Sequence, residues 1–138
     1  MQLNDMLAYK VAMLSSDLSE SLAAVYEPYG LTMPEWRVLA TLGNATSLTS
    51  KYIAAATRLD KVKTSRALRQ LEVKRLVKRE TNKNVKRAIN ISLSEAGERI
   101  YHALTPLVAK WQADRLENIT ADEYHIFLKV INGLSQQK

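Results

Sequence analysis

The N-terminal segment carries apolar side chains at helical spacing. Its stripe, in steps of three and four residues, consists of Leu3, Leu7, Val11, Leu14, Leu18, Leu22 and Val25. Such steps resemble the heptad seam of a coiled coil, so the pattern predicts one long helix from residue 3 to about residue 27, ended by Gly30. The stripe fits two roles that the sequence leaves open: burial in the chain's own core, or contact with a second copy.

Two capping signals predict shorter helices after the first one. A capping box over residues 32–35, with proline in its first turn, opens a helix that stops near Gly43. Thr49 then caps a short helix over residues 50–57. The side chains expected to face inward from this short helix are Tyr52, Ile53 and Ala56.

A longer amphipathic helix follows a tight turn at residues 58–59. Asp60 is a favourable N-cap for a helix that runs to about Lys74. The side chains expected on its inner side are Ser65, Leu68, Leu71 and Leu76. Those expected on its outer side are Lys63, Arg66, Gln70 and Lys74. A short helix, a turn of about three to four residues and a longer helix form the layout of a helix-turn-helix.

The period of the pattern then changes from helical to two. Residues 77–81 and 88–93 alternate in the way that is typical of strands, and residues 82–84 are turn formers that tolerate left-handed backbone. This predicts a β-hairpin with a basic tip. Lys78 and Arg79 would face opposite sides of the first strand, so we expect one to meet a partner and the other to pair with an acid, Glu72 or Glu80.

Two further helices complete the chain. Ser94 caps the first, and Pro106 inside it predicts a kink or a break. A capping box over residues 120–123 opens the second. Their apolar positions are Ile100, Leu104, Leu107, Val108, Trp111 and Leu116, then Tyr124, Phe127, Leu128, Ile131 and Leu134. The order of elements predicts a mainly α fold with a small β-hairpin, in a single domain over residues 1–138.

Positive charge is concentrated in one part of the chain. Residues 58–87 hold twelve of the twenty Lys and Arg residues and only three acids, a formal charge of +9. The remaining eight bases and eleven acids sum to −3, so the net +6 comes from one segment. A patch of this kind is the electrostatic footprint of a surface that holds a polyanion.

Composition argues against several kinds of site. The absence of Cys excludes disulfides, thiol catalysis and thiolate metal ligands. No Ser/His/Asp set, Gly-rich phosphate loop or carboxylate pair stands out, and His102 with His125 would make a poor metal site. We therefore predict no catalytic residue, metal or cofactor. Without a signal peptide or an apolar run near the roughly 20 residues of a membrane helix, the expected location is the cytoplasm.

The order of elements and several motifs resemble the MarR family of bacterial transcription regulators. The motifs are Leu31-Thr32, Trp36-Arg37-Val38-Leu39, Asp60-Lys61, Ser65-Arg66, Leu71-Glu72, Leu76-Val77-Lys78-Arg79, Arg87, Leu93-Ser94-Glu95 and Gly97. Together they cover nearly the whole chain. Three positions depart from the family pattern: Arg75 replaces a usual Gly, Val85 replaces an Asp that braces the wing, and Ser94 replaces a usual Thr.

The resemblance implies a homodimeric, sequence-specific repressor of a pseudo-palindromic operator. It assigns residues 32–93 to a winged helix-turn-helix lobe that binds double-stranded DNA, and residues 1–30 and 94–138 to a dimerisation lobe. The dimerisation residues expected from the apolar stripes are Leu7, Val11, Leu14, Leu18, Trp111, Phe127, Ile131 and Leu134.

The residue types of the basic segment suit DNA grooves. The major groove admits one α-helix, so Lys61, Lys63 and Arg66 can donate to guanine or clamp phosphates, and Val62 can meet a thymine methyl. The remaining expected contacts are Ser65 and Arg69 on the same helix, Thr49 and Ser50 at a helix N-terminus, and Lys83, Lys86 and Arg87 on the wing. The resemblance places Arg87 in the minor groove.

The resemblance also implies a small phenolic or anionic effector between the two lobes. The candidate ligand residues, each of which can equally be a core or rim residue, are Tyr26, Tyr29, Trp36, Arg37 and His102. An alternative function is a winged helix that binds RNA or serves as a protein-interaction adaptor. Residues 58–87 contain no aromatic side chain, which argues against recognition of single-stranded RNA.

Overall fold

The structure is a computed structural model that describes residues 1–81 and 89–136. In chain order its elements are η1 (Leu3–Asp5), α1 (Leu7–Tyr26), η2 (Glu27–Tyr29), α2 (Met33–Leu42), β1 (Leu48–Thr49), α3 (Ser50–Thr57), α4 (Lys61–Val73), β2 (Val77–Thr81), β3 (Ile89–Leu93), α5 (Glu95–Arg115) and α6 (Ala121–Gln136). The mainly helical architecture with one small antiparallel sheet confirms the predicted fold class.

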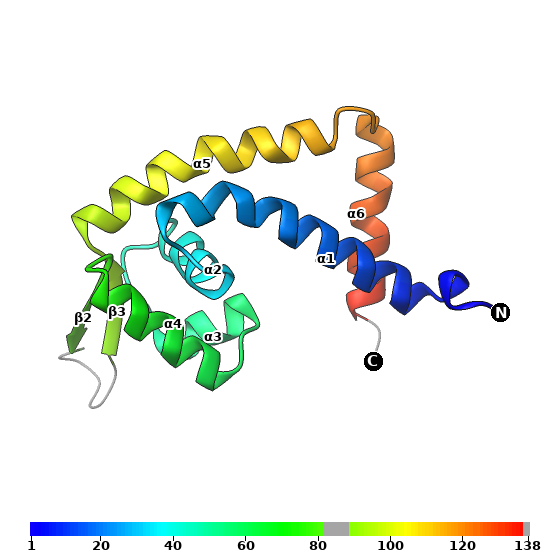
Figure 1. Cartoon of the computed structure of the whole chain (residues 1–138). Coiled ribbons are helices and arrows are strands. Elements are labelled where there is room, and N and C mark those ends of the chain that lie inside the picture. Colours follow the sequence, from blue (N-terminus) through cyan, green and yellow to red (C-terminus); the bar gives the residue numbers. More distant parts are fainter. Residues whose placement is uncertain (82–88, 137–138) are drawn as a thin grey trace.

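The elements separate into two regions (Figure 1). Helices α1 and α5 lie side by side and run in opposite directions. Helices α2, α3 and α4 and the sheet lie together near the end of α1 and the start of α5, whereas α6 stands apart at the far end of α5. The part of the chain with the basic segment therefore projects from a scaffold made by its two ends.

The hydrophobic core lies mainly in the region that contains α2, α3, α4 and the sheet. Its buried side chains are Tyr26, Leu31, Val38, Leu39, Leu42, Ile53, Leu59, Ala67, Leu68, Leu71, Leu76, Val77, Ile91, Leu93 and Leu104. These residues come from every element from α1 to α5 except the short elements η2 and β1. Leu48 of β1 packs partly buried against them. One continuous core thus holds the helix-turn-helix and the sheet together.

Three inward-facing predictions on α3 and α4 are wrong. Tyr52 has 57% of its surface exposed, and Ala56 and Ser65 are exposed as well. The buried positions are instead Thr57 and Thr64. Their hydroxyls donate to main-chain carbonyls of the preceding turn, at 2.7 Å and 2.9 Å, so a polar side chain can be buried there without losing its hydrogen bonds.

The sheet contains the predicted hairpin and one strand that the sequence did not predict. Strands β2 and β3 pair antiparallel from Val77↔Leu93 to Thr81↔Ile89, which confirms the period-two prediction. Strand β1 pairs with the other edge of β3, so the sheet order is β1-β3-β2. Two residues are too few to show alternation, and only the tertiary pairing makes them a strand.

Helix α5 continues without a break through Pro106, so the break considered for this position is wrong. Packing on both sides of the proline accounts for this. Leu104 is fully buried, and one turn beyond Pro106 the indole Nε1 of Trp111 donates a 2.9 Å hydrogen bond to Ser21 Oγ on α1. These contacts offset the main-chain hydrogen bond that proline cannot donate.

The apolar stripe of α1 divides between its two possible roles. Leu22 and Val25, near the end of the helix, pack against the core. Leu7, Val11 and Leu14, in its first half, are 58%, 51% and 44% exposed. The first half therefore presents an apolar face that nothing in the described chain covers.

None of the helices in residues 1–81 and 89–136 combines the length and hydropathy of a membrane span.

Candidate nucleic-acid interface

The turn between α3 and α4 is built by three consecutive residues. Arg58 ends α3 in the left-handed conformation, with a φ of 57°. Leu59 is buried in the core and anchors the turn. Asp60 then caps α4, because its Oδ1 accepts a 2.7 Å hydrogen bond from the backbone N–H of Lys63. The predicted N-cap is confirmed, and it directs the first turn of α4 outward from the core.

Helix α4 has one buried and one basic side. Its buried residues are Thr64, Ala67, Leu68 and Leu71. The exposed residues of its first three turns are Lys61, Val62, Lys63, Ser65, Arg66, Arg69 and Gln70. Five of the predicted contacts, Lys61, Val62, Ser65, Arg66 and Arg69, line one shallow hollow of about 370 Å³. The structure thus brings these predicted residues together on one exposed, positively charged side of the helix.

Val62 is the apolar exception on this basic side. Its side chain is 66% exposed, on the opposite side of the helix from the buried Leu71. An exposed valine among cations suits contact with a thymine methyl in the major groove. Its position supports a surface that meets base edges as well as phosphates.

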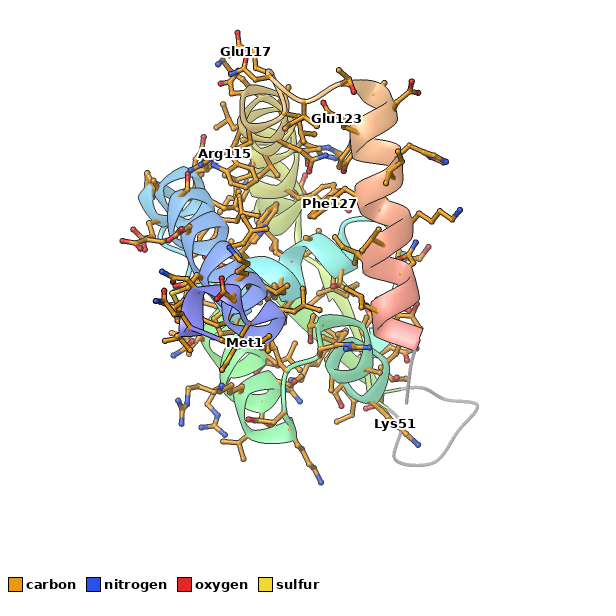
Figure 2. All side chains as sticks on the ribbon, turned by 90° about the vertical axis from the view of Figure 1, so that its right-hand side faces the viewer. Met1, Lys51, Arg115, Glu117, Glu123 and Phe127 are labelled. Atoms are coloured by element: carbon orange, nitrogen blue, oxygen red, sulfur yellow. The ribbon has the colours of Figure 1, made fainter. Side chains whose placement is uncertain are left out.

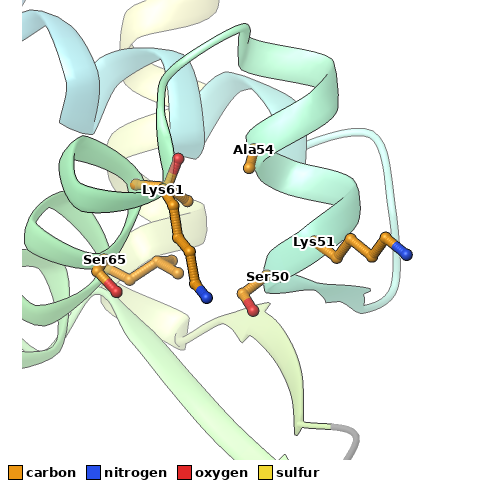
Figure 3. Close-up of a pocket in the computed structure, with 7 residues that line it drawn as sticks. Ser50, Lys51, Ala54, Lys61 and Ser65 are labelled. Carbon is orange, nitrogen blue, oxygen red and sulfur yellow. The ribbon is translucent and has the colours of Figure 1, made fainter.

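A cleft of about 470 Å³ separates α3 from α4 (Figure 3). It is lined by Ser50, Lys51 and Ala54 from α3 and by Lys61, Thr64, Ser65 and Leu68 from α4. Figure 3 shows the Lys61 side chain reaching down between the two helices, with its ammonium on the side where Ser50 lies. The predicted contacts from the two helices therefore lie close to one another.

Lys51 is a further candidate contact that was not predicted from the sequence. It lies next to Ser50 in the first turn of α3, where it is exposed and, in Figure 3, extends away from the cleft. A lysine in the first turn of a helix opposes the positive end of the helix dipole, which an anion would favour. That mismatch is the signal that could have identified it. Thr49 caps α3 by accepting from the Tyr52 N–H at 3.2 Å.

The base of the wing is fixed to α4 by an ion pair. Arg79 on β2 pairs with Glu72 on α4, and Lys78 is exposed. This confirms that one of the two strand cations pairs with an acid. The predicted wing contacts Lys83, Lys86 and Arg87, together with Val85, lie outside the described residues.

Arg75 adopts the conformation expected of the glycine that it replaces. Its φ is 61°, and the main chain continues into β2 through Leu76. Ser94 holds this turn from the opposite strand: its Oγ donates to the Arg75 carbonyl at 2.7 Å, and its N–H donates to the Leu76 carbonyl at 2.9 Å. The turn is therefore made without glycine, with support from the residue that caps α5.

The five candidate ligand residues do not gather around one cavity. Tyr26 is buried and stacks on Trp36, with ring centroids 6.0 Å apart. Burial, with the nearby Glu27 carboxylate, raises the pKa of Tyr26, which Arg37 partly opposes. Tyr29 lines a hollow between α1 and α5, whereas His102 lines a different one beside Gly43. Tyr26 and Trp36 thus have a clear structural role in the core.

The predicted dimerisation residues form an exposed apolar surface at the other end of the molecule. On α6, Phe127, Ile131 and Leu134 are 45%, 40% and 44% exposed. Figure 2 shows Phe127 on the side of α6 that faces the rest of the chain. Together with Leu14 and Leu18 of α1, Phe127 lines an open groove of about 470 Å³. Trp111 is instead partly buried between α5 and α1, with Arg115 stacked over its ring.

Comparison with known proteins gives a consistent match. Residues 29–88 match the sequence model of the MarR family. A MarR/EmrR family transcriptional regulator from Acinetobacter sp. ADP1 is 24% identical, with a TM-score of 0.83 over 99% of this chain and 100% of that chain. A MepR–DNA complex from S. aureus is 22% identical, with a TM-score of 0.86 over 96% and 98%. A mutant MarR from E. coli complexed with operator DNA is 23% identical, with a TM-score of 0.86 over 93% and 92%.

Proposed function

We propose that this chain is a DNA-binding transcriptional regulator of the MarR family, whose sequence model matches residues 29–88, and that it is a homodimeric repressor of a pseudo-palindromic operator. The observation that carries the proposal is the basic, exposed side of α4 on a helix-turn-helix. Members of this family are regulators and not enzymes. A repressor acts at the chromosome, so we place the protein in the cytoplasm.

Helix α4 is the element that enters the major groove in this proposal. Lys61, Lys63 and Arg66 donate to base edges or phosphates, and Val62 meets a thymine methyl. Ser50 and Lys51, across the cleft from Lys61, hold the flanking phosphates. Arg87 and the neighbouring wing cations contact the minor groove, as the family resemblance implies.

A second protomer, bound through α1 and α6, supplies the other half of the DNA interface in this proposal. The two helices expose apolar side chains that an isolated chain would leave in water. A twofold dimer would place two copies of α4 about one turn of DNA apart, roughly 34–36 Å. Light scattering at micromolar protein should give twice the chain mass, and a monomer mass would contradict this part of the proposal.

Tyr29 is the predicted ligand residue whose surroundings best suit an aromatic anion. Its hollow of about 430 Å³ also contains Trp111 and Lys110, an aromatic ring and a cation. Lys110 pairs with Asp114 at 2.7 Å and would have to exchange that partner. We propose this hollow as the effector site, to be tested by calorimetry with small phenols and aromatic acids against Tyr29→Ala.

Selection of bound fragments from genomic DNA with purified protein tests the function directly. The selected site should contain an inverted repeat, and binding to it should weaken steeply with added salt because several phosphates are neutralised together. Added protein should lower transcription from a promoter that carries the site. Equal affinity for single-stranded RNA, or a flat salt response, would favour the RNA-binding or adaptor alternative.

Matched substitutions test the assignment of α4. Lys63→Ala should weaken binding to the selected site, whereas Lys129→Ala, which removes an equally exposed lysine from α6, should not. Arg66→Ala should lower affinity by about 5- to 150-fold if Arg66 reads a guanine, since such a contact contributes about 1–3 kcal/mol. If Lys63→Ala and Arg66→Ala bind like the parent protein, α4 is not the reading helix.

A further inference from the structure

An ion pair between the buried carboxylate of Glu35 and the partly exposed ammonium of Lys74 joins α4 to the start of α2. The Glu35 side chain is only 1% exposed, and its Oε2 lies 2.5 Å from Nζ of Lys74. Its Oε1 accepts hydrogen bonds from Thr32, at 3.0 Å from the backbone N–H and 2.8 Å from the hydroxyl. The carboxylate therefore has a partner for each oxygen, as a buried charge requires.

Lys74 also contacts a third element. Its Nζ donates a 2.6 Å hydrogen bond to the carbonyl of Gly30, the left-handed residue that ends η2. Gly30 lies where α1, the helix of the dimerisation region, gives way to α2, which packs against α4 (Figure 1). One ammonium thus ties the end of α4 to the junction between the two regions of the molecule.

The position of Lys74 within α4 makes this contact geometrically strict. Lys74 is the C-cap of the helix, and the chain turns away at Arg75 directly after it. The cation is therefore anchored at the last turn of α4, while the residues that face DNA occupy its first turns. A shift of the last turn relative to Gly30 would tilt the whole helix, because its buried side is rigidly packed.

We propose that Glu35 and Lys74 are positioning residues for DNA recognition. Their ion pair, with the Gly30 contact, fixes the orientation of α4 relative to α1 and so sets the separation of the two α4 helices in a dimer. This inference rests on the proposed function of α4 as the reading helix. In this inference, two residues outside the DNA-facing surface control which half-site spacing the protein accepts.

Stability alone does not account for such a pair. Desolvation of the Glu35 carboxylate offsets much of its attraction to Lys74, and solvent screens the lysine, whose side chain is 38% exposed, so the pair contributes little net stability. An apolar pair at these two positions would have no donor for the Gly30 carbonyl. The charged pair therefore contributes a directed link between α4 and the junction that close packing would not supply.

The test compares operators of different half-site spacing. The site selected by the parent protein is remade with one base pair inserted or removed between its half-sites, which moves them along and around the helix axis. We expect the parent to lose about tenfold or more in affinity on either change, because paired recognition helices bind at a fixed spacing. The double variant Glu35→Met/Lys74→Met should melt near the parent but lose at least about threefold of this discrimination.

Three further variants keep the test decisive. Glu35→Gln retains the shape of the side chain and an acceptor for Thr32 but removes its charge, so it should fold even if the double variant does not and should also weaken spacing discrimination. Lys74→Arg retains the charge and the donors, so it should discriminate between half-site spacings as the parent does. Leu104→Val, which truncates a buried core residue, controls for lost stability and should leave spacing discrimination unchanged.

The outcomes separate this inference from the function on which it rests. If the parent selects an inverted repeat and Glu35→Gln discriminates between spacings as the parent does, the positioning role is overturned while the proposed function stands. The positioning role is likewise overturned if Leu104→Val, at an equal loss of melting temperature, weakens discrimination as strongly. If the parent selects no DNA at all, the proposed function fails instead.

Discussion

Arg75 closes helix α4 in a conformation that suits glycine. Its φ is 61°, and two main-chain hydrogen bonds of 2.9 Å hold the turn: Arg75 N–H donates to the Glu72 carbonyl, and Leu76 N–H donates to the Leu71 carbonyl. The left-handed region costs a residue with a Cβ about 1–2 kcal/mol, whereas glycine enters it freely. The native sequence therefore carries strain at the point where α4 leads into β2.

We predict that Arg75→Gly is more stable than Arg75→Ala. Both variants remove the same guanidinium group, so the comparison isolates the Cβ. The relief of about 1–2 kcal/mol is offset by about 0.5–1 kcal/mol, because glycine has more freedom to lose on folding. The free energy of unfolding should therefore be about 0.5–1 kcal/mol larger for the glycine variant.

Urea unfolding at one fixed protein concentration measures this difference. With a slope of about 2 kcal/mol/M, the midpoint for Arg75→Gly should lie about 0.3–0.5 M above that for Arg75→Ala. The fixed concentration matters because the stability of a dimer depends on it. Gln70, inside α4, provides the matched control, since glycine should be less stable than alanine there. Equal midpoints at position 75, or a lower midpoint for glycine, would refute the reasoning.

Three further predictions concern packing, ionisation and the wing. Gly97→Ala should lower the melting temperature strongly, at a cost of about 1–3 kcal/mol, because its Cβ would lie 2.1 Å from the Leu76 carbonyl oxygen. Burial raises the pKa of Tyr26 above its usual value of 10.0, so the unfolded chain loses the phenolic proton at a lower pH than the folded chain does. The free energy of unfolding, measured by urea titration, should therefore fall as the pH rises through 10, and it should fall less in Tyr26→Phe. Glu72→Gln should cost less than about 1 kcal/mol in thermal unfolding, since the pair with Arg79 is partly exposed, and a larger loss would contradict this.

Much of the fold was predictable because its signals are local. A capping box depends on two residues three positions apart, so the sequence predicted where α2 and α6 start. Hydrogen bonds at Thr32 and Thr120 confirm both starts. The single caps at Thr49, Asp60 and Ser94 are confirmed in the same way. The hairpin also followed from its period of two.

Errors arose where the pattern was ambiguous or the cause was distant. The alanine-rich helix α3 has no clear apolar stripe, so its inward side was misassigned at Tyr52 and Ala56. Pro106 predicts a kink or a break by its own chemistry, but the helix does not break there, and contacts with α1 stabilise it. The strand at 48–49 exists only because β3 lies beside it. The exposed, basic side of α4 was predictable from charge and period, whereas Lys51 was not singled out from the sequence.

By itself the sequence determined which segments form the α-helices and the hairpin strands, where most of their caps lie and which segment concentrates the positive charge. These properties depend on neighbours within a few residues along the chain. Only the tertiary structure decided how the α1 stripe divides between core and exposed surface, and that Lys74 reaches Glu35 and Gly30. Contacts between residues about 40 positions apart leave no periodic trace, because each partner alone is an ordinary exposed lysine or a capping glutamate. Their meeting is a property of how the helices pack.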